Sequence, residues 1–154
     1  MTTIRHAFFP ADTAAVLDIW REYVASPTVS LDYQGYDAEF ADLPGKYAQP
    51  DGRLIVAERL GQLVGCIALR NVSTEICEMK RLYVRPHARG LGIGHGLVTR
   101  LIGEAKDAGY SEMRLDVLAE FKQAQALYQR LGFVAADPVS TNPVPGTSFL
   151  GLRL

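Results

Sequence analysis

The stretch VRPHARGLGIGHGL, residues 84–97, has a glycine at every second position from Gly90 to Gly96. Glycine has no Cβ, so this density disfavours regular structure and leaves the backbone open to close approach. A strand-like apolar run precedes the stretch, and apolar residues at helical spacing follow it. Backbone amides at such a junction, with the positive end of a helix dipole behind them, bind phosphate groups. We therefore predict a strand, a loop that binds a phosphate or pyrophosphate, and a helix.

Two other phosphate-binding loops do not fit this stretch. A P-loop ends in Gly-Lys-Ser or Gly-Lys-Thr, and the glycines here are followed by neither. The dinucleotide fingerprint GxGxxG fails because its third glycine falls on His95 or on Leu97. The pattern that remains is Arg89-x-x-Gly92-x-Gly94.

Composition and charge narrow the class of protein. The chain has 154 residues, 48% of them hydrophobic, and a formal net charge of −1. These values are typical of one soluble globular domain over residues 1–154, and the neutral charge predicts no nucleic-acid or membrane partner. The charge is unevenly distributed, however, because all the charged residues between Glu78 and Glu104 are lysine or arginine. The glycine-rich loop therefore lies in a locally basic region.

The termini and the cysteines indicate the compartment. The N-terminus lacks the apolar core of a signal peptide. Cys66 and Cys77 form no metal-binding pattern, and we expect free thiols on neighbouring strands and no bound metal. These features predict a cytoplasmic protein.

Apolar periodicity predicts the order of the elements. We expect strands and helices in the order strand 3–9, helix 13–25, short helix 37–43, strands 54–58, 63–69 and 76–84, helix 97–108, strand 113–117, helix 124–131, and strands 133–136 and 147–154. This order predicts an α+β fold with a strand, glycine loop, helix and strand at its centre.

Two sequence blocks carry a resemblance to a known family. The first, EMKRLYVRPHARGLGIGHGL, contains the Arg89, Gly92 and Gly94 pattern, and the second, ALYQRLGF, follows it at residues 126–133. Together they resemble the GNAT superfamily of N-acetyltransferases, in particular its small single-domain bacterial-type members. The resemblance implies a mixed, mostly antiparallel sheet of about seven strands with a central splay, flanked by about four helices. It also implies acetyl-CoA as cosubstrate.

The resemblance assigns the cofactor-binding residues position by position. The pyrophosphate would lie on the loop amides, and the pantetheine would pair with the exposed edge of the preceding strand. The residues implied for cofactor binding are Leu82, Tyr83, Val84, Arg89, Gly90, Leu91, Gly92, Ile93, Gly94 and His95. Arg85 and Arg100 would add positive charge near the phosphates. Many family members have Asn where this chain has Phe121, so that polar contact to the pantetheine is missing here or supplied elsewhere.

Two side chains are candidates for the chemistry. Tyr128 matches the family tyrosine that faces the cofactor sulfur, and we predict that it protonates or hydrogen-bonds the leaving thiolate. Glu78 begins the strand that ends at the loop, and we predict it as the base for the amine, with an ion pair to Lys80 or Arg81 as the alternative. Strict alternation would place Glu78 on one face with Lys80, Leu82 and Val84. Asp116 is either a substrate anchor or, with more weight, a charge-pairing residue.

The acceptor is less defined by the sequence than the cosubstrate. We expect specificity to come from residues 26–49, including Tyr33, Tyr36 and Glu39, and from the loop 138–148. The long first segment favours a capped pocket, and hence a small amine or an amino-acid-like metabolite. The alternatives are acetylation of a protein lysine or N-terminus, and a CoA-binding module without catalysis. The final strands, if exposed, would offer an edge for a homodimer.

Overall fold

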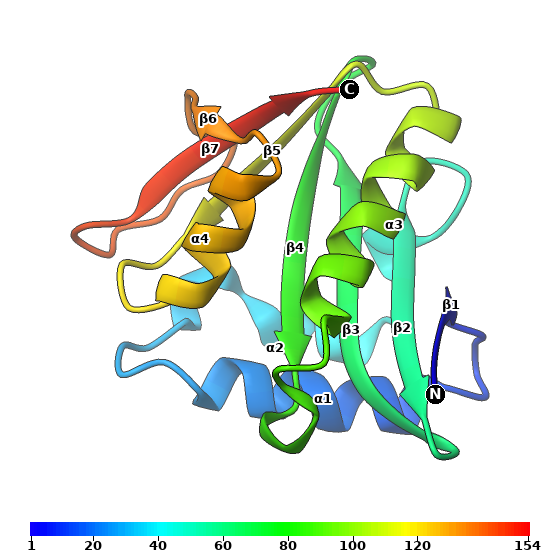
Figure 1. The fold of residues 1–154 in the computed structure, drawn as a ribbon. Helices are drawn as coiled ribbons and strands as arrows, with labels where there is room; N and C mark the ends of the chain where they lie inside the picture. The colour runs from blue at the N-terminus through cyan, green and yellow to red at the C-terminus, as the bar shows by residue number, and fades with distance from the viewer.

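A computed structural model of residues 1–154 shows a seven-stranded sheet in the order β1-β2-β3-β4-β5-β7-β6 (Figure 1). The strands are β1 (Thr2–His6), β2 (Arg53–Arg59), β3 (Gln62–Asn71), β4 (Ile76–Val84), β5 (Glu112–Val117), β6 (Val134–Ala135) and β7 (Ser148–Arg153). All neighbouring pairs are antiparallel except β4 and β5, which are parallel. The predicted mixed sheet is therefore confirmed.

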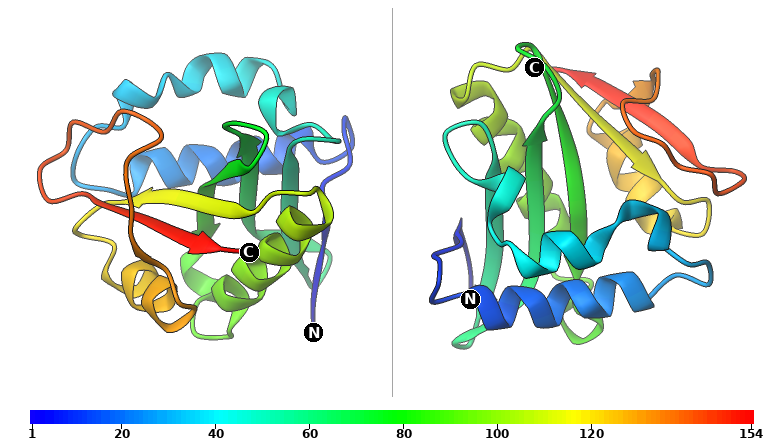
Figure 2. Two further views of the ribbon diagram at one scale, coloured as in Figure 1. Left: turned by 90° about the horizontal axis from the view of Figure 1, so that it is seen from above. Right: turned by 180° about the vertical axis from the view of Figure 1, so that it is seen from behind.

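Four α-helices cover the two faces of this sheet (Figure 2). They are α1 (Thr13–Ala25), α2 (Tyr36–Ala41), α3 (Ile93–Asp107) and α4 (Lys122–Arg130), with short 3-10 turns η1 (Asp32–Gln34), η2 (Gly45–Tyr47) and η3 (Pro86–Ala88). Helices α1 and α2 lie on one face, and α3 and α4 lie on the other. Helix α3 begins earlier than the apolar repeat predicted, because Gly94 and Gly96 are tolerated inside its first turns.

Each face has its own buried core. On the α3 face, Leu97 and Leu101 of the helix are fully buried against strand residues such as Ile67 and Met113. On the α1 face, Ile19 and Trp20 are fully buried against β2 and β3. The continuous apolar run of β3, buried from Leu63 to Leu69, follows from this arrangement of layers.

The parallel contact between β4 and β5 is short. Only three residue pairs are in register, from Ile76 with Glu112 to Glu78 with Arg114. Beyond Glu78 the two strands separate, as Figure 1 shows. The central splay implied by the resemblance is therefore present, and β4 has an unpaired edge from Met79 to Val84.

An irregularity in β4 corrects one expectation. Cys66 of β3 lies opposite Tyr83 and Ala68 opposite Lys80, so that two β4 residues, Arg81 and Leu82, oppose one residue of β3. Arg81 has a φ of +63°, in the left-handed region, as in a β-bulge. The bulge reverses the alternation, and the prediction that Glu78 and Lys80 share a face with Leu82 and Val84 is wrong.

After the correction, the two faces of β4 have distinct chemistry. Met79, Leu82 and Val84 pack with the core under α3 and α4. Tyr83 packs with the core under α1. Because the bulge lies within the splayed part of the strand, residues from both sides of β4 reach the gap beside β5.

Candidate active site

The glycine-rich loop presents free backbone amides. Gly90 and Gly92 have φ values of +83° and +77°, and Gly92 is the N-cap of α3. The amide groups of residues 90–95 donate no hydrogen bond within the chain, and the first helical bond runs from Gly96 N to Gly92 O at 3.0 Å. A Cβ at Gly90 or Gly92 would point into open space. The loop therefore offers a row of unsatisfied donors at a helix N-terminus, which suits an anionic group such as a pyrophosphate.

The side chains of the loop hold it in place. Arg89 donates from Nε to the carbonyl oxygen of Val84 at 2.8 Å, and its guanidinium lies 5.4 Å from the centre of the Tyr83 ring. Ile93 is buried in the core beneath α3, whereas Leu91 and His95 are exposed. The backbone, rather than these side chains, is thus the part of the loop that is open to a ligand.

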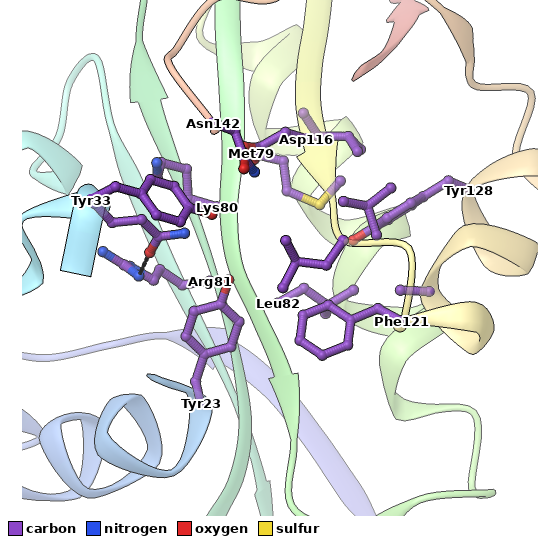
Figure 3. Close-up of a pocket in the computed structure, with 15 residues that line it drawn as sticks. Tyr23, Tyr33, Met79, Lys80, Arg81, Leu82, Asp116, Phe121, Tyr128 and Asn142 are labelled. Atoms are coloured by element: carbon purple, nitrogen blue, oxygen red, sulfur yellow. Dashed lines mark hydrogen bonds between the residues drawn. The ribbon is translucent and has the colours of Figure 1, made fainter. Parts of the chain in front are cut away.

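A pocket opens where β4 and β5 separate, and it connects the two faces of the sheet (Figure 3). Its lining residues come from α1, η1, β4, β5, the segment between β5 and α4, α4 and the loop before β7: they are Tyr23, Tyr33, Gln34, Met79, Lys80, Arg81, Leu82, Leu115, Asp116, Val117, Leu118, Phe121, Ala124, Tyr128 and Asn142. Tyr33, Lys80 and Arg81 lie on one side of β4, and Leu82, Phe121 and Tyr128 lie on the other. The pocket is therefore polar on the α1 side and largely apolar on the α4 side.

Tyr128 lies on the apolar side of this pocket. It is 5% exposed, and its ring packs against Phe133 at a centroid distance of 5.6 Å. Burial raises the pKa of its hydroxyl, and nearby Tyr23 and Asp116 raise it further. The hydroxyl is therefore protonated at neutral pH, and it is suited to donate a proton or hydrogen bond.

Comparison with known proteins decides the family. A model of the acetyltransferase (GNAT) family matches residues 15–133. The chain belongs to the GNAT family. It is 38% identical over 136 residues to an uncharacterised N-acetyltransferase of Schizosaccharomyces pombe, covering 87% of this chain and 83% of the relative. It is also 32% identical over 128 residues to an N-acetylaspartate synthetase of Danio rerio, covering 80% of this chain and 45% of that protein.

Solved structures agree with this assignment. A Salmonella typhimurium protein solved with its cofactor acetyl-CoA superposes with a TM-score of 0.71 at 25% identity, covering 99% of this chain and 93% of that chain. An N-acetyltransferase of Thermoplasma acidophilum in complex with CoA shares the fold, with a TM-score of 0.78 at 18% identity and coverage of 100% and 99%. The protein is thus a GNAT N-acetyltransferase with an acetyl-CoA-binding fold. No helix in the structure combines the length and the hydropathy that a membrane span requires.

The carboxylate predicted as base in this GNAT protein is engaged by other residues. Glu78 is 1% exposed, and it does not line the pocket. Its Oε1 accepts a hydrogen bond from Arg70 Nε at 2.6 Å, and its Oε2 accepts one from Ser140 Oγ at 2.8 Å. Lys80 Nζ is 4.0 Å from Oε1. The main ion-pair partner of Glu78 is therefore Arg70, whereas the sequence had suggested Lys80 or Arg81.

The carboxylate that does line the pocket is Asp116. Its Oδ2 accepts a hydrogen bond from Asn142 Nδ2 at 2.8 Å, and Asn142 belongs to the loop between β6 and β7. Residue type and position favoured a structural role for Asp116, and nothing in the sequence singled out Asn142. No local signal marks Asn142, because it reaches the site through the antiparallel pairing of β5 with β7.

Two arginines expected near the phosphates have partners elsewhere. Arg85 Nε lies 3.0 Å from a carboxylate oxygen of Glu22. Arg100 Nε donates to Glu104 at 3.0 Å, and its Nη1 donates to the carbonyl oxygen of Ile4 at 3.1 Å. Arg85 therefore links the end of β4 to α1, and Arg100 links α3 to β1.

Proposed function

We propose that the protein transfers the acetyl group of acetyl-CoA to the primary amine of a small molecule or amino-acid-like metabolite. The observation that carries this proposal is the covered pocket at the splay. Tyr33 and Gln34 of η1 line it from the segment after α1, and Asn142 lines it from the loop before β7. A pocket covered by two such segments suits a small acceptor better than a protein surface.

The remaining free donors and the free strand edge suit the cosubstrate. We propose that the amides of residues 90–95 bind the pyrophosphate and that the edge from Met79 to Val84 pairs with the pantetheine amides. The cosubstrate supplies an activated acetyl thioester. The side chains of Leu82, Phe121 and Ala124 would form an apolar wall beside the pantetheine. Phe121 stands where many family members have Asn, so it offers no polar contact there.

We propose that Tyr128 is the general acid. The amine nitrogen forms a bond to the acetyl carbon, the carbon–sulfur bond breaks, and the tyrosine hydroxyl donates its proton to the sulfur. A hydroxyl with a raised pKa keeps its proton until the thiolate develops, so it contributes most in the transition state. A main-chain N–H near Val84 would stabilise the oxyanion.

The proton of the amine requires a carboxylate, and two candidates remain. Glu78 is the residue that the sequence predicts, but Arg70 and Ser140 occupy its two oxygens. Asp116 lines the pocket and has only Asn142 as a hydrogen-bond partner. We propose Asp116 as the group that orients and deprotonates the amine, with Glu78 stabilising β4 through Arg70.

The test is acetyl-CoA-dependent thiol release across a panel of small amines and lysine-containing peptides. We expect release with small amines and a loss of turnover of about 10²–10⁴-fold in Asp116→Asn. Glu78→Gln should leave the pH profile of the remaining activity unchanged. If Glu78→Gln altered the pH profile of activity and Asp116→Asn did not, Glu78 would be the base. Release with peptides alone would indicate a protein acetyltransferase, and CoA binding without any release would indicate a non-catalytic module.

We also propose a compartment, a domain organisation and an oligomeric state. Two buried free thiols, Cys66 and Cys77, fit a reducing compartment, and we propose a cytoplasmic protein of one domain. The edge strand β6 has an exposed apolar residue, Val134, and we propose this edge as the contact of a homodimer. Sedimentation equilibrium of the wild type and Val134→Lys tests the homodimer.

A further inference from the structure

Lys80 is a nearly buried cation that has no hydrogen-bond partner. Its side chain is 13% exposed and lines the pocket, and none of its amine hydrogens is donated within the chain. The nearest acidic oxygen, Glu78 Oε1 at 4.0 Å, already accepts a 2.6 Å hydrogen bond from Arg70. A desolvated ammonium without an acceptor is costly, so such groups usually meet an anion.

The second pocket cation differs from Lys80 in this respect. Arg81 donates to Glu39 Oε2 at 2.7 Å and also to Gln34, so that its charge is balanced within the protein. The arrangement therefore leaves a single pocket cation, Lys80, available to a ligand. Burial lowers the pKa of Lys80, and the carboxylates of Glu78 and Asp116 oppose this change; an anionic ligand would oppose it further.

A neighbouring hydroxyl points to the same ligand. Tyr33 lines the pocket on the side of β4 where Lys80 lies (Figure 3). Its hydroxyl oxygen is buried and has no hydrogen-bond partner in the chain. Lys80 and Tyr33 thus offer donors with no acceptor, and both belong to the wall away from Tyr128. A carboxylate, which has two acceptor oxygens and one negative charge, would satisfy both.

We propose that Lys80, assisted by Tyr33, binds the carboxylate of the acceptor, so that the enzyme selects amines that also carry a carboxylate. This inference rests on the proposed function. Figure 3 places Asp116 between the side of Lys80 and the side of Tyr128. An amino acid bound with its carboxylate at Lys80 therefore directs its amine toward Asp116 and the reacting centre. Lys80 acts as a specificity-determining residue, and takes no part in the proton transfers.

The test compares matched acceptors in matched variants. Thiol release from acetyl-CoA is measured with α-, β- and γ-amino acids and with the carboxamide of each, which keeps the shape but lacks the charge. We expect the wild type to prefer the carboxylates. Lys80→Met should lower kcat/KM for the best carboxylate about 10- to 100-fold, the effect of one charged hydrogen bond, and leave the carboxamides nearly unchanged. Lys80→Arg should retain the preference for carboxylates.

The controls separate a specificity role from a structural one. Lys106→Met removes an exposed lysine of α3 and should have no effect on the preference. Lys80→Met should fold and should melt no lower than the wild type, because a mostly buried ammonium without a hydrogen-bond acceptor is removed. Tyr33→Phe should weaken the carboxylate preference in the same direction as Lys80→Met and by a smaller factor.

The outcomes distinguish this inference from the proposed function. Equal turnover of carboxylates and carboxamides in the wild type, or an unchanged preference in Lys80→Met, would overturn the role of Lys80 while leaving the acetyltransferase intact. No thiol release with any small amine would overturn the proposed function, and the inference with it.

Discussion

Arg81 Nη2 lies 2.7 Å from Glu39 Oε2, and this ion pair attaches α2 to the bulge of β4. The Arg81 side chain is fully buried, and its guanidinium lies 5.5 Å from the Trp20 ring centre and 5.6 Å from that of Tyr23. Arg81 thus links the bulge of β4 to α2, through Glu39, and to α1, through Trp20 and Tyr23.

Removing the acidic partner should destabilise the fold strongly. Glu39→Gln leaves the buried Arg81 charge uncompensated, and we expect the free energy of unfolding to fall by about 3–5 kcal/mol. Urea denaturation measures the loss. Lys46→Met is the matched control, because Lys46 contacts the same carboxylate at 2.7 Å but is 44% exposed, and it should cost about 1 kcal/mol or less. Equal losses in the two variants would contradict the role of Arg81.

The same pair predicts a loss of stability in acid. Burial alone raises the pKa of Glu39, but Arg81 and Lys46 outweigh it and hold the pKa below the usual value of 4.5. A carboxyl with a depressed pKa in the folded state stabilises the protein above its unfolded-state pKa. That stability is lost as the pH falls through the folded-state pKa. We expect unfolding free energy to decline below about pH 4.5 in the wild type, and less steeply in Glu39→Gln.

Tyr128→Phe should separate catalysis from binding. The variant keeps the ring that packs against Phe133 and removes the proton donor, so turnover should fall about 10²–10⁴-fold. Acetyl-CoA affinity, measured by calorimetry, should stay close to that of the wild type. Tyr110→Phe is the control, since its hydroxyl donates to the carbonyl oxygen of Asp51 at 2.8 Å outside the pocket. That variant should lose some stability and keep its turnover.

Substitutions at two glycines of α3 should affect different properties of the protein. Gly94 contributes one of the free loop amides, and a Cβ there would lie 3.8 Å from Leu127 and 4.0 Å from Val84. Gly94→Val should therefore obstruct the cosubstrate and weaken acetyl-CoA binding about tenfold or more, the value of one charged hydrogen bond. Gly103 has open space beside it, and Gly103→Ala should add about 0.5–1 kcal/mol of stability with unchanged affinity. Unchanged affinity in Gly94→Val would refute the loop assignment.

The two cysteines should be unreactive in the folded protein. Burial raises the pKa of the Cys66 thiol to about 12, and it raises that of Cys77 to about 12 as well. Because the thiolate is the reactive form, a disulfide reagent at pH 8 should label neither residue until denaturant is added. Rapid labelling of the native protein would show that the β3–β4 region opens. If neither cysteine reacts, the same reagent can measure the CoA thiol released by the enzyme without a signal from the protein.

The loop could be predicted from the residues and the splay from the family resemblance, whereas the faces of β4 could not be predicted. The glycines of residues 90–96 carry a local signal, since their amides and backbone angles depend on few distant contacts. The bulge at Arg81 depends on Glu39, Gln34 and Trp20, which lie far along the chain. An arginine with a positive φ has no local signature, so simple alternation wrongly placed Lys80 on one face with Leu82 and Val84.

The same limit applies to the polar residues of the site. Ser140 contacts Glu78, and Asn142 contacts Asp116, across 62 and 26 residues of sequence. Thr28 and Glu120 are joined in the same way, with the Thr28 hydroxyl 2.9 Å from Glu120 Oε1. Each contact depends on how a loop packs against a segment that is distant in the sequence. Residue type and spacing alone could therefore indicate a covered pocket but could not identify which side chains line it.

The bare edge of β4 also has a consequence for handling the protein. Open strand edges normally lie at the rim of a sheet, where they invite pairing with other chains. Here the edge from Met79 to Val84 lies at the middle of the sheet, between the helices of its two faces (Figure 2). Any partial unfolding that moves α4 would expose this edge to pairing with other chains. Because CoA binding would stabilise the folded state, purification and storage with CoA should reduce aggregation.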